Sequence, residues 1–325
     1  MGDWIQLLGG GLLLYLGAEW FVTGASSLAL ALRIPQLLVG LTVVAYGTSA
    51  PEIIVGIQAA AGGHGDVALG NVIGSNVANV GLILGLVALI QPPRVAGDLR
   101  RRELPVLLAS TALLPMLLID GTISRADGVL LVSVALLYTG WMIRSARRAS
   151  AIVSAAAGAQ AAATAADLAG APEPKKGAPR AAAIAVAGLV ILLLGGHVFI
   201  EGAISVARAL GASDRLVGLT IVAVGTSLPE LVTSLIAARR GQSDLAVGNV
   251  VGSNIFNALL CLGASGLAGA ISGSLSELSV DLVALMVMTL LVAVSLRRER
   301  IMSRAEGGLA LLLYVAFVAL TVARG

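Results

Sequence analysis

The sequence predicts an all-α membrane protein of ten transmembrane helices, arranged as two five-helix halves. Two observations lead to this prediction: the chain is 58% hydrophobic but only 12% charged, and it contains one pair of motifs twice. Soluble domains have about a quarter charged residues, and the apolar runs here reach the roughly 20 residues that a helix needs to cross a bilayer. We therefore expect the lipid bilayer to surround most of the molecule.

The repeat covers residues 40–86 and 218–264. Each residue of the first copy pairs with the residue 178 positions later, without a gap, and just over half of the pairs are identical. The matches include Glu, Asn, Asp, Pro and Thr, which chance does not supply in a chain made mostly of Ala, Leu, Val and Gly. A duplication of this kind is the first feature to interpret. The copies contain GLTVVAYGTSAPE and DVALGNVIGSNVANVGLILG, then GLTIVAVGTSLPE and DLAVGNVVGSNIFNALLCLG.

The predicted organisation is a first half over 1–148, an Ala-rich linker over 149–179, and a second half over 180–325. The linker carries three prolines and two lysines, and we expect it to be mobile or partly helical. The expected spans lie at about 4–30, 36–61, 67–90, 104–120, 126–146, 181–210, 216–238, 245–270, 278–296 and 305–323.

The basic residues predict the orientation of these spans. With ten spans, 17 of the 21 Lys and Arg residues fall on the side of the linker, including Arg239 and Arg240. That side is expected to be cytoplasmic, so both termini should lie outside. Five helices per half is an odd number, so the second half should enter the membrane from the opposite side. Inverted-topology repeats of this kind are typical of secondary transporters.

Each repeat also predicts a helix that is broken at mid-membrane. In the first, Gly47 to Glu52 reads GTSAPE; Pro51 lacks an N–H and clashes with the carbonyl four residues earlier. We expect the helix to unwind there and to leave the carbonyls of residues 45–49 without partners. Glu52 follows directly, and Glu230 follows the matching break in the second half. Buried carboxylates beside free carbonyls form an oxygen-rich site for a hard cation.

A polar stripe on the next helix of each half is expected to complete this site. Asn71, Ser75 and Asn79 are spaced four residues apart and so lie on one helix face. Beside the stripe, Gly70 and Gly74 should let a neighbouring backbone approach closely. The second half repeats the stripe, so four side chains are predicted around one centre: Glu52, Asn79, Glu230 and Asn257.

Each of these features also has a purely structural interpretation. A stripe of Asn and Ser can hydrogen-bond neighbouring helices, a proline can merely kink a helix, and a membrane glutamate can pair with an arginine. The last alternative is unavailable inside the repeats, because residues 40–85, 218–238 and 241–263 contain no Lys or Arg. The joint, duplicated occurrence favours an ion site.

The two motif pairs resemble the alpha-repeats of the cation/calcium antiporter superfamily, and specifically sodium/calcium exchangers of the bacterial inner-membrane type. The resemblance implies exchange of calcium for sodium, with the broken-helix glutamates and the last Asn of each G-S-N-x-x-N motif as ion ligands. The implied ligand set is Glu52, Glu230, Asn79, Asn257, Thr48, Ser49, Thr226, Ser227, Ser75 and Ser253, with carbonyls near Ala45 and Ala223.

The chain departs from many exchangers at Asn257, where they carry Asp. The departure removes one carboxylate and puts potassium co-transport in doubt. The acidic residue that the proton/calcium branch places soon after G-N-A is missing, because Val72 and Ile73 follow Asn71. Proton coupling remains an alternative, as does another divalent cation. A cation channel with the same oxygen-rich centre is the alternative from a different class.

Other classes of function find no support in the sequence. The chain has no Ser–His pair, metal-binding His spacing or phosphate loop, so we expect neither an enzyme nor a cofactor. The single cysteine, Cys261, excludes an internal disulfide and is expected to pack. The net charge of +3 does not indicate nucleic-acid binding, and no protein partner is evident. Glu19 and Glu201 fall inside the first and sixth spans; in the repeat register, Glu19 pairs with His197.

Overall fold

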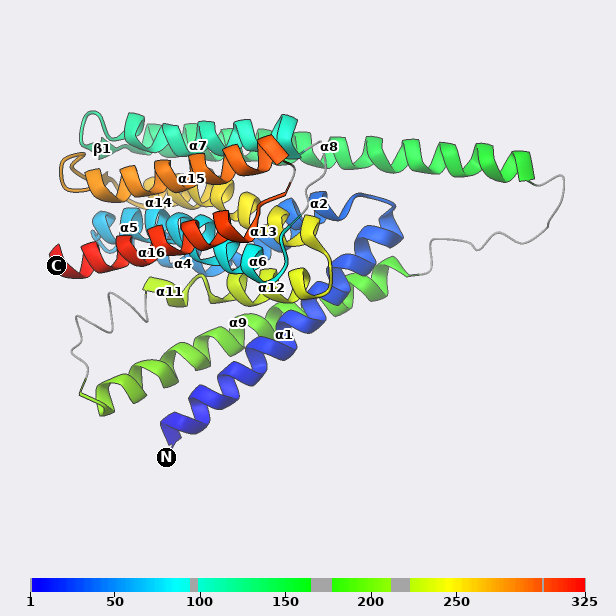
Figure 1. Cartoon of the computed structure of the whole chain (residues 1–325). Helices are drawn as coiled ribbons and strands as arrows, with labels where there is room; N and C mark the ends of the chain where they lie inside the picture. The colour runs from blue at the N-terminus through cyan, green and yellow to red at the C-terminus, as the bar shows by residue number, and fades with distance from the viewer. Residues whose placement is uncertain (1, 94–98, 165–176, 212–222, 300, 325) are drawn as a thin grey trace.

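The computed structural model describes residues 2–93, 99–164, 177–211, 223–299 and 301–324, and these are almost wholly helical (Figure 1). The first half contains α1 (Gly2–Leu32), α2 (Gln36–Val39), η1 (Gly40–Val44), α3 (Ala45–Thr48), α4 (Ala50–Ala61), α5 (Gly65–Val77), η2 (Ala78–Ile83), α6 (Leu84–Ile90), η3 (Leu99–Glu103), α7 (Leu104–Leu117), β1 (Thr122–Ile123) and α8 (Arg125–Thr164). The second half contains α9 (Ala178–Ala209), α11 (Ala223–Gly225), α12 (Leu228–Arg239), α13 (Ser243–Phe256), η5 (Asn257–Cys261), α14 (Leu262–Ala268), β2 (Ile271–Ser272), α15 (Ser279–Glu299) and α16 (Arg304–Arg324). The elements labelled η are π-helical turns.

Seven helical segments among the described residues are long and apolar enough to cross a membrane, and a bent pair raises the number to eight. Two expected spans fall short of this criterion. The span predicted at 104–120 is represented by α7, which has 14 residues. The span predicted at 216–238 is represented by α12, with 12 residues, because residues 216–222 lie outside the described part. The count of ten spans therefore stays a prediction.

Helix α8 extends into the predicted linker. It has 40 residues and ends at Thr164, well past the expected boundary at residue 149. Figure 1 shows it projecting beyond the body of the molecule. Alanine has the highest helix propensity, and the Ala-rich composition of this segment explains the continuation. The rest of the predicted linker, residues 165–176, lies outside the described residues.

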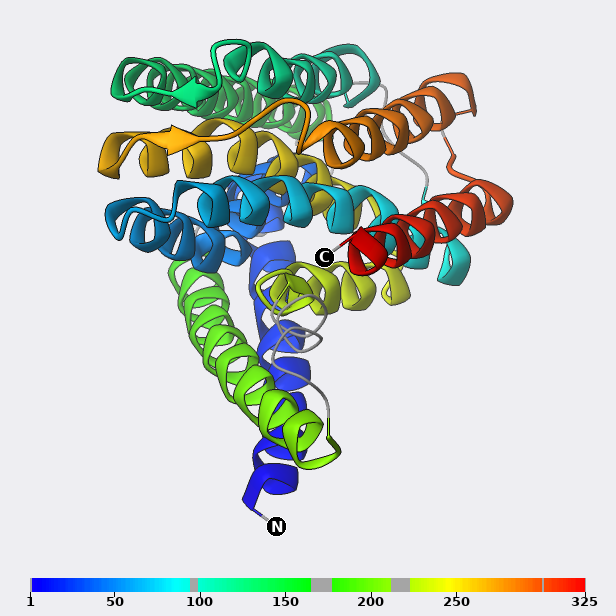
Figure 2. The ribbon, with the colours of Figure 1, turned by 90° about the vertical axis from the view of Figure 1, so that its left-hand side faces the viewer.

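Helices α1 and α9 form an antiparallel pair that runs obliquely across the other helices (Figures 1 and 2). Glycines let the two backbones approach each other closely. A Cβ atom on Gly17 would lie 2.3 Å from the backbone nitrogen of Leu192, and one on Gly195 would lie 2.5 Å from that of Leu14. Small residues at such crossings are typical of helix pairs in membranes.

The interior is formed by two composite helices that occupy matching positions in the repeat. The segment α5–η2–α6 spans Gly65–Ile90, and α13–η5–α14 spans Ser243–Ala268, so both ends are related by the offset of 178. The two helices are joined by a reciprocal pair of amides. Asn76 Nδ2 donates to the carbonyl of Asn254 at 3.2 Å, and Asn254 Nδ2 donates to the carbonyl of Asn76 at 3.3 Å.

A short antiparallel ladder links the two halves at one end of the molecule. Thr122 of β1 pairs with Ser272 of β2, and Ile123 pairs with Ile271. The two isoleucines are buried. The ladder thus ties the α7–α8 connection to the chain that follows α14.

The close packing of α1 on α9 generates a first prediction. Replacing Gly195 with Ala would place a methyl group against the Leu14 backbone, which cannot move aside without shifting the helix. Overpacking of this kind costs about 1–3 kcal/mol. We expect Gly195→Ala to lower the thermal unfolding midpoint of the detergent-solubilised protein.

Gly140 of α8 supplies the matched control, because no heavy atom lies within 4 Å of its added Cβ. Since Ala is favoured over Gly inside a helix by up to about 1 kcal/mol, Gly140→Ala should leave the midpoint unchanged or raise it. Equal midpoints for the two variants would contradict the packing described for Gly195.

Candidate ion-binding site

The predicted break in the first repeat is present at Ser49. The helical segments Gln36–Thr48 and Ala50–Ala61 meet there at an angle of 44°. Pro51 lies in the first turn of α4, where its missing N–H leaves no hydrogen bond unmade. In the second repeat, α11 ends at Gly225 and α12 begins at Leu228 with Pro229 in its first turn. Each glutamate therefore sits in the first turn of a helix that begins inside the protein.

The expectation of free carbonyls at the first break is wrong for two of the residues. The carbonyl of Ala45 accepts a hydrogen bond from the N–H of Ser49 at 3.0 Å, and the carbonyl of Ser49 accepts one from the N–H of Ile53 at 3.2 Å. The bend is shallow enough for these helical bonds to survive on either side of it. A carbonyl oxygen has a second lone pair, and Thr48 Oγ1 also lies 3.5 Å from the carbonyl oxygen of Ala45.

The two glutamates are bound by serines from both halves of the chain. Ser227 Oγ donates to Glu52 Oε1 at 3.2 Å, and Ser49 Oγ donates to Glu230 Oε1 at 3.0 Å, so each break contacts the carboxylate of the other break. The stripe serines of the same half complete the arrangement at longer range, since Ser75 Oγ lies 3.4 Å from Glu52 Oε1 and Ser253 Oγ lies 3.5 Å from Glu230 Oε1.

Several polar atoms at this centre have no hydrogen-bond partner among the described residues. Glu52, Glu230, Asn79 and Asn257 are all 0% exposed. The Oε2 atoms of both glutamates and both amide atoms of each asparagine form no hydrogen bond within the described residues. An unsatisfied buried carboxylate is strongly unfavourable. Such a set of orphaned oxygens is the arrangement that a cation would stabilise.

Asn71 and Asn249, the first residues of the two stripes, support the breaks. Asn71 Nδ2 donates to the backbone carbonyl of Glu52 at 3.1 Å, and Asn249 Nδ2 lies 3.4 Å from that of Glu230. Asn249 Oδ1 also accepts from Thr48 Oγ1 at 3.1 Å, which joins the first break to the second stripe. These amides bind the backbone carbonyls of the glutamates and not their carboxylates.

Cys261 is buried as expected, but it also has a polar contact. Its Sγ lies 3.1 Å from the backbone carbonyl of Glu52. At the related position in the first half, residue 83, the chain has Ile. The contact follows from the tertiary packing of η5 against α4, and the sequence alone contains no signal for it.

Asn79 and Asn257 lie in π-helical turns at matching positions, η2 and η5. Single π-helical turns inside α-helices are rare and are frequently found at functional sites. The reciprocal pair Asn76 and Asn254 lies one turn before them, and sequence reasoning gave it no role. The doubled G-S-N motif was the available signal, because its Asn is identical in both copies.

The predicted residues at the edge of the site are less closely engaged. Thr226 is half-buried in the turn between α11 and α12, and Ala223 begins α11. No contact described for either residue reaches a glutamate. Of the twelve predicted residues, hydrogen bonds join Glu52, Glu230, Ser49, Ser227, Ser75 and Ser253.

The glycine pairs beside the stripes behave differently in the two halves. A Cβ on Gly248 would lie 2.8 Å from the carbonyl oxygen of Leu37, and one on Gly252 would lie 2.9 Å from that of Leu41, so a backbone does approach there. At Gly70 and Gly74, no heavy atom of the described chain lies within 4 Å. In the register of 178, the residues related to Leu37 and Leu41 are residues 215 and 219, which lie outside the described residues, so the close approach expected at Gly70 and Gly74 stays a prediction.

The chemistry of the donor set favours a hard cation. Within the described ranges, no cluster of three or more His, Cys, Asp or Glu side chains could hold a metal. The centre instead combines two carboxylates with hydroxyl and amide groups. Oxygen ligands of this kind suit calcium and sodium better than a transition metal.

Comparisons with known proteins agree with this geometry. The sequence profile of the family described as "Sodium/calcium exchanger protein" matches residues 3–144 and 180–323. The chain is 30% identical over 349 residues to the sodium/calcium exchanger MaX1 of Methanosarcina acetivorans, covering 97% of each protein. It is 35% identical over 257 residues to the inner membrane protein YrbG of Escherichia coli, covering 79% of this chain and 77% of that one.

Solved structures show the same fold. A structure of the sodium-calcium exchanger NCX_Mj, soaked with 2.5 mM Na+ and 0.1 mM Ca2+, superposes with a TM-score of 0.83 at 31% sequence identity, covering 98% of each chain. The profile match, the full-length relatives and this superposition cover both halves of the sequence. The chain is therefore a multi-pass membrane protein of the sodium/calcium exchanger family.

Proposed function

We propose that this protein is a secondary active antiporter that exchanges calcium for sodium across the membrane by alternating access. The observation that supports it best is the pair of buried glutamates, each with one unpartnered oxygen and each bonded by a serine of the other half. NCX_Mj and MaX1, both named as sodium/calcium exchangers, support the choice of ions. Calcium and sodium are then the cargo, and no cofactor is needed.

The proposed ligands are the residues inferred from the sequence. Glu52 and Glu230 supply the charge, and the amides of Asn79 and Asn257 supply neutral oxygens. The hydroxyls of Thr48, Ser49, Thr226, Ser227, Ser75 and Ser253 and the carbonyls of Ala45 and Ala223 complete the set. This assignment is supported by the burial of the four central side chains and by their missing partners.

Exchange follows from the charge of this site. Two carboxylates buried without a counter-ion are costly, so the empty site resists the passage between the two access states. Calcium or sodium relieves that cost by binding the same oxygens, and hence each excludes the other. Calcium and sodium therefore cross the membrane in separate, alternating conformational changes of the protein.

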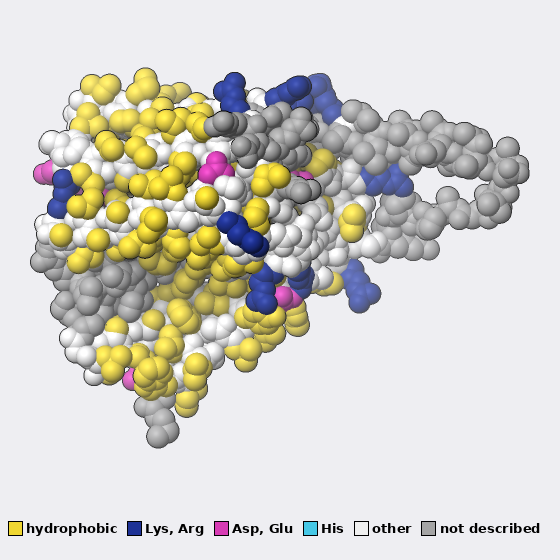
Figure 3. Space-filling view, viewed as in Figure 1, with side chains coloured by type: hydrophobic (Ala, Val, Ile, Leu, Met, Phe, Trp, Pro, Cys, Tyr) yellow, Lys and Arg dark blue, Asp and Glu magenta, His cyan; other side chains and the backbone are white. Residues whose placement is uncertain are grey.

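The membrane topology that we propose has ten spans in two inverted repeats, with the linker in the cytoplasm and both termini outside. The surface supports it: Figure 3 shows hydrophobic side chains over the body, and most of the visible Lys and Arg side chains lie toward the end from which α8 projects. Such asymmetry is typical of the cytoplasmic side. The proposed location is the bacterial inner membrane.

Replacing Glu52 with Gln should abolish sodium-driven calcium uptake in proteoliposomes. The substitution keeps the shape of the side chain but removes half of the charge at the site. Removing one member of a buried charged arrangement costs about 3–5 kcal/mol, which corresponds to a loss of about two to four orders of magnitude in calcium affinity.

Glu201→Gln provides the matched control, because the Glu201 side chain is 56% exposed and lies on α9 away from the breaks. That variant should retain uptake, and both variants should elute as folded protein on size exclusion. Full uptake by Glu52→Gln would remove Glu52 from the proposed ligand set. Uptake driven by a pH gradient without sodium would favour proton coupling, and rapid uptake without any counter-ion gradient would favour a channel.

Asn257→Asp should have the opposite effect on calcium. The added carboxylate strengthens the attraction for a divalent ion, so the KM for calcium should fall by about three- to tenfold. Asn79→Asp, at the related position of the first half, should act in the same direction. Calcium flux measured over a range of concentrations tests both, and an unchanged or higher KM would place these amides outside the ion-binding centre.

A further inference from the structure

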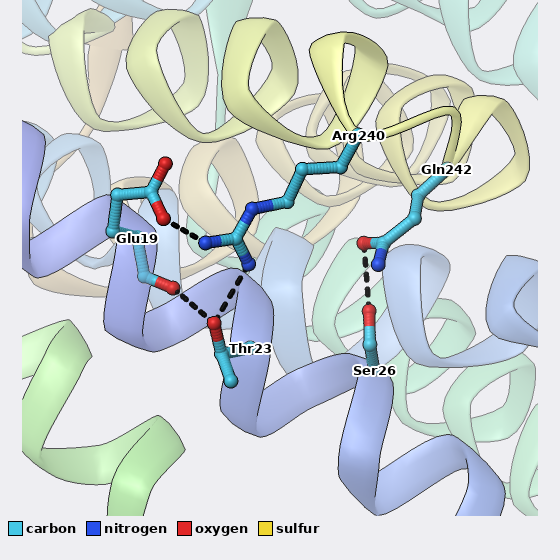
Figure 4. Close-up of polar contacts among 5 residues, drawn as sticks. All are labelled: Glu19, Thr23, Ser26, Arg240 and Gln242. Atoms are coloured by element: carbon cyan, nitrogen blue, oxygen red, sulfur yellow. Dashed lines mark hydrogen bonds and ion pairs between the residues drawn. The ribbon is translucent and has the colours of Figure 1, made fainter.

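A polar cluster joins the α1/α9 pair to the rest of the molecule at one end (Figure 4). Glu19, Thr23 and Ser26 follow one face of α1, since they are spaced four and three residues apart. Opposite them, Arg240 and Gln242 lie in the turn between α12 and α13. The cluster therefore connects the oblique helix pair with the helix that carries Glu230.

The contacts within the cluster are specific. Arg240 forms an ion pair with Glu19 through Nη2, while its Nη1 donates to Thr23 Oγ1 at 2.7 Å. Ser26 Oγ donates to Gln242 Oε1 at 2.7 Å. The side chains of Arg240 and Glu19 are only 32% and 26% exposed, so solvent screens this pair less than it screens an ion pair on an open surface.

Nearer the centre of the molecule, the same helix pair contacts the broken helices through apolar side chains. A Cβ on Gly47 would meet Phe21 of α1 and Leu189 of α9, and one on Gly225 would meet Ile200 of α9. Apolar contacts have no preferred direction, and they allow one surface to slide over another. The polar cluster, in contrast, is satisfied in one position of α1.

In the repeat, the residues at the opposite end differ from those of this cluster. In the register of 178, Glu19 and Thr23 correspond to His197 and Glu201, and Arg240 and Gln242 correspond to Gly62 and His64. Gly62 has no side chain with which to bind α9. His197 instead lies 3.3 Å from Glu201 on its own helix, and both side chains are more than half exposed.

We propose that Arg240, Glu19 and their neighbours form a latch that makes the two access states of the exchanger unequal in free energy. The proposal rests on the alternating access proposed above, and it assigns the change between the two states to a shift of the α1/α9 pair along the broken helices. The described position, with α1 tied to the α12–α13 turn, gains the latch. In the opposite position, α9 would meet the α4–α5 turn, where Gly62 offers no cation.

The latch predicts reciprocal changes in affinity on the two sides of the membrane. Because the latch fixes α1 against the α12–α13 turn, we assign to the latched state access from the opposite end, which carries the termini. Glu19→Gln breaks the ion pair and reduces the population of this state. In vesicles with a single orientation, the KM for calcium should rise on the termini side and fall on the α12–α13 side, changing their ratio by about three- to tenfold.

Two further variants separate the latch from general damage to the fold. Exchanging the charges, with Glu19→Arg and Arg240→Glu together, should bring the ratio back toward that of the unmodified protein. Glu277→Gln, at an exposed position between β2 and α15, should leave the ratio unchanged. An unchanged ratio in Glu19→Gln, or a KM that rises equally on both sides, would overturn the proposal.

Hydrogen–deuterium exchange in nanodiscs tests the latch without any transport. Glu19→Gln should speed amide exchange in peptides that cover Arg239 to Ser243 and slow it in peptides that cover Ala61 to Gly65. Faster exchange at both turns, or no change at either, would contradict the latch. If the unmodified protein carried no sodium-driven calcium flux but showed this opposite pair of changes, the proposed function would fail while the latch would stand.

Discussion

The structure is organised around two carboxylates that are buried where a membrane protein can least tolerate them. Glu52 and Glu230 are fully buried, and each has one oxygen without a hydrogen-bond partner in the described part of the chain. Burying an unpaired charge is more costly than any single packing contact can offset. A bound cation would offset this cost, and the surrounding elements keep the two carboxylates close together. The serine of each break supports the carboxylate of the other, so neither half has a complete site alone.

Much of this centre could be predicted from the sequence because it depends on local chemistry that the chain contains twice. Pro51 in GTSAPE predicts the break, which is found at Ser49. What could not be predicted depends on tertiary packing. Nothing in the local sequence specifies that Asn71 and Asn249 bind the backbone of the glutamates, that π-helical turns carry Asn79 and Asn257, or that Cys261 contacts Glu52. The Ala-rich composition predicts a linker, but alanine also has the highest helix propensity, and α8 continues to Thr164.

The positions at which the two copies of the repeat differ are as informative as the positions at which they are identical. The first copy has Gly at position 56, and the second has Ser at the matching position 234. A Cβ on Gly56 would lie 2.4 Å from Ser265 Oγ, so a side chain there would have to displace that hydroxyl. In the second half, Ser234 Oγ accepts a hydrogen bond from Asn249. Position 62 is Gly where position 240 is Arg, and only the arginine can reach Glu19. The two halves thus form a symmetric polar centre inside an asymmetric frame. In the proposed exchange, a symmetric centre suits an ion that must be reached from both sides, and the asymmetric frame would give the two access states different free energies.

The most direct test of the paired-carboxylate site is anomalous diffraction from crystals soaked in calcium and then in excess sodium. We expect one anomalous peak, from a calcium ion bound by carboxylate oxygens of both Glu52 and Glu230. This peak should disappear when sodium replaces calcium. A calcium peak bound by only one of these glutamates, or a peak that persists at saturating sodium, would contradict the paired-carboxylate site.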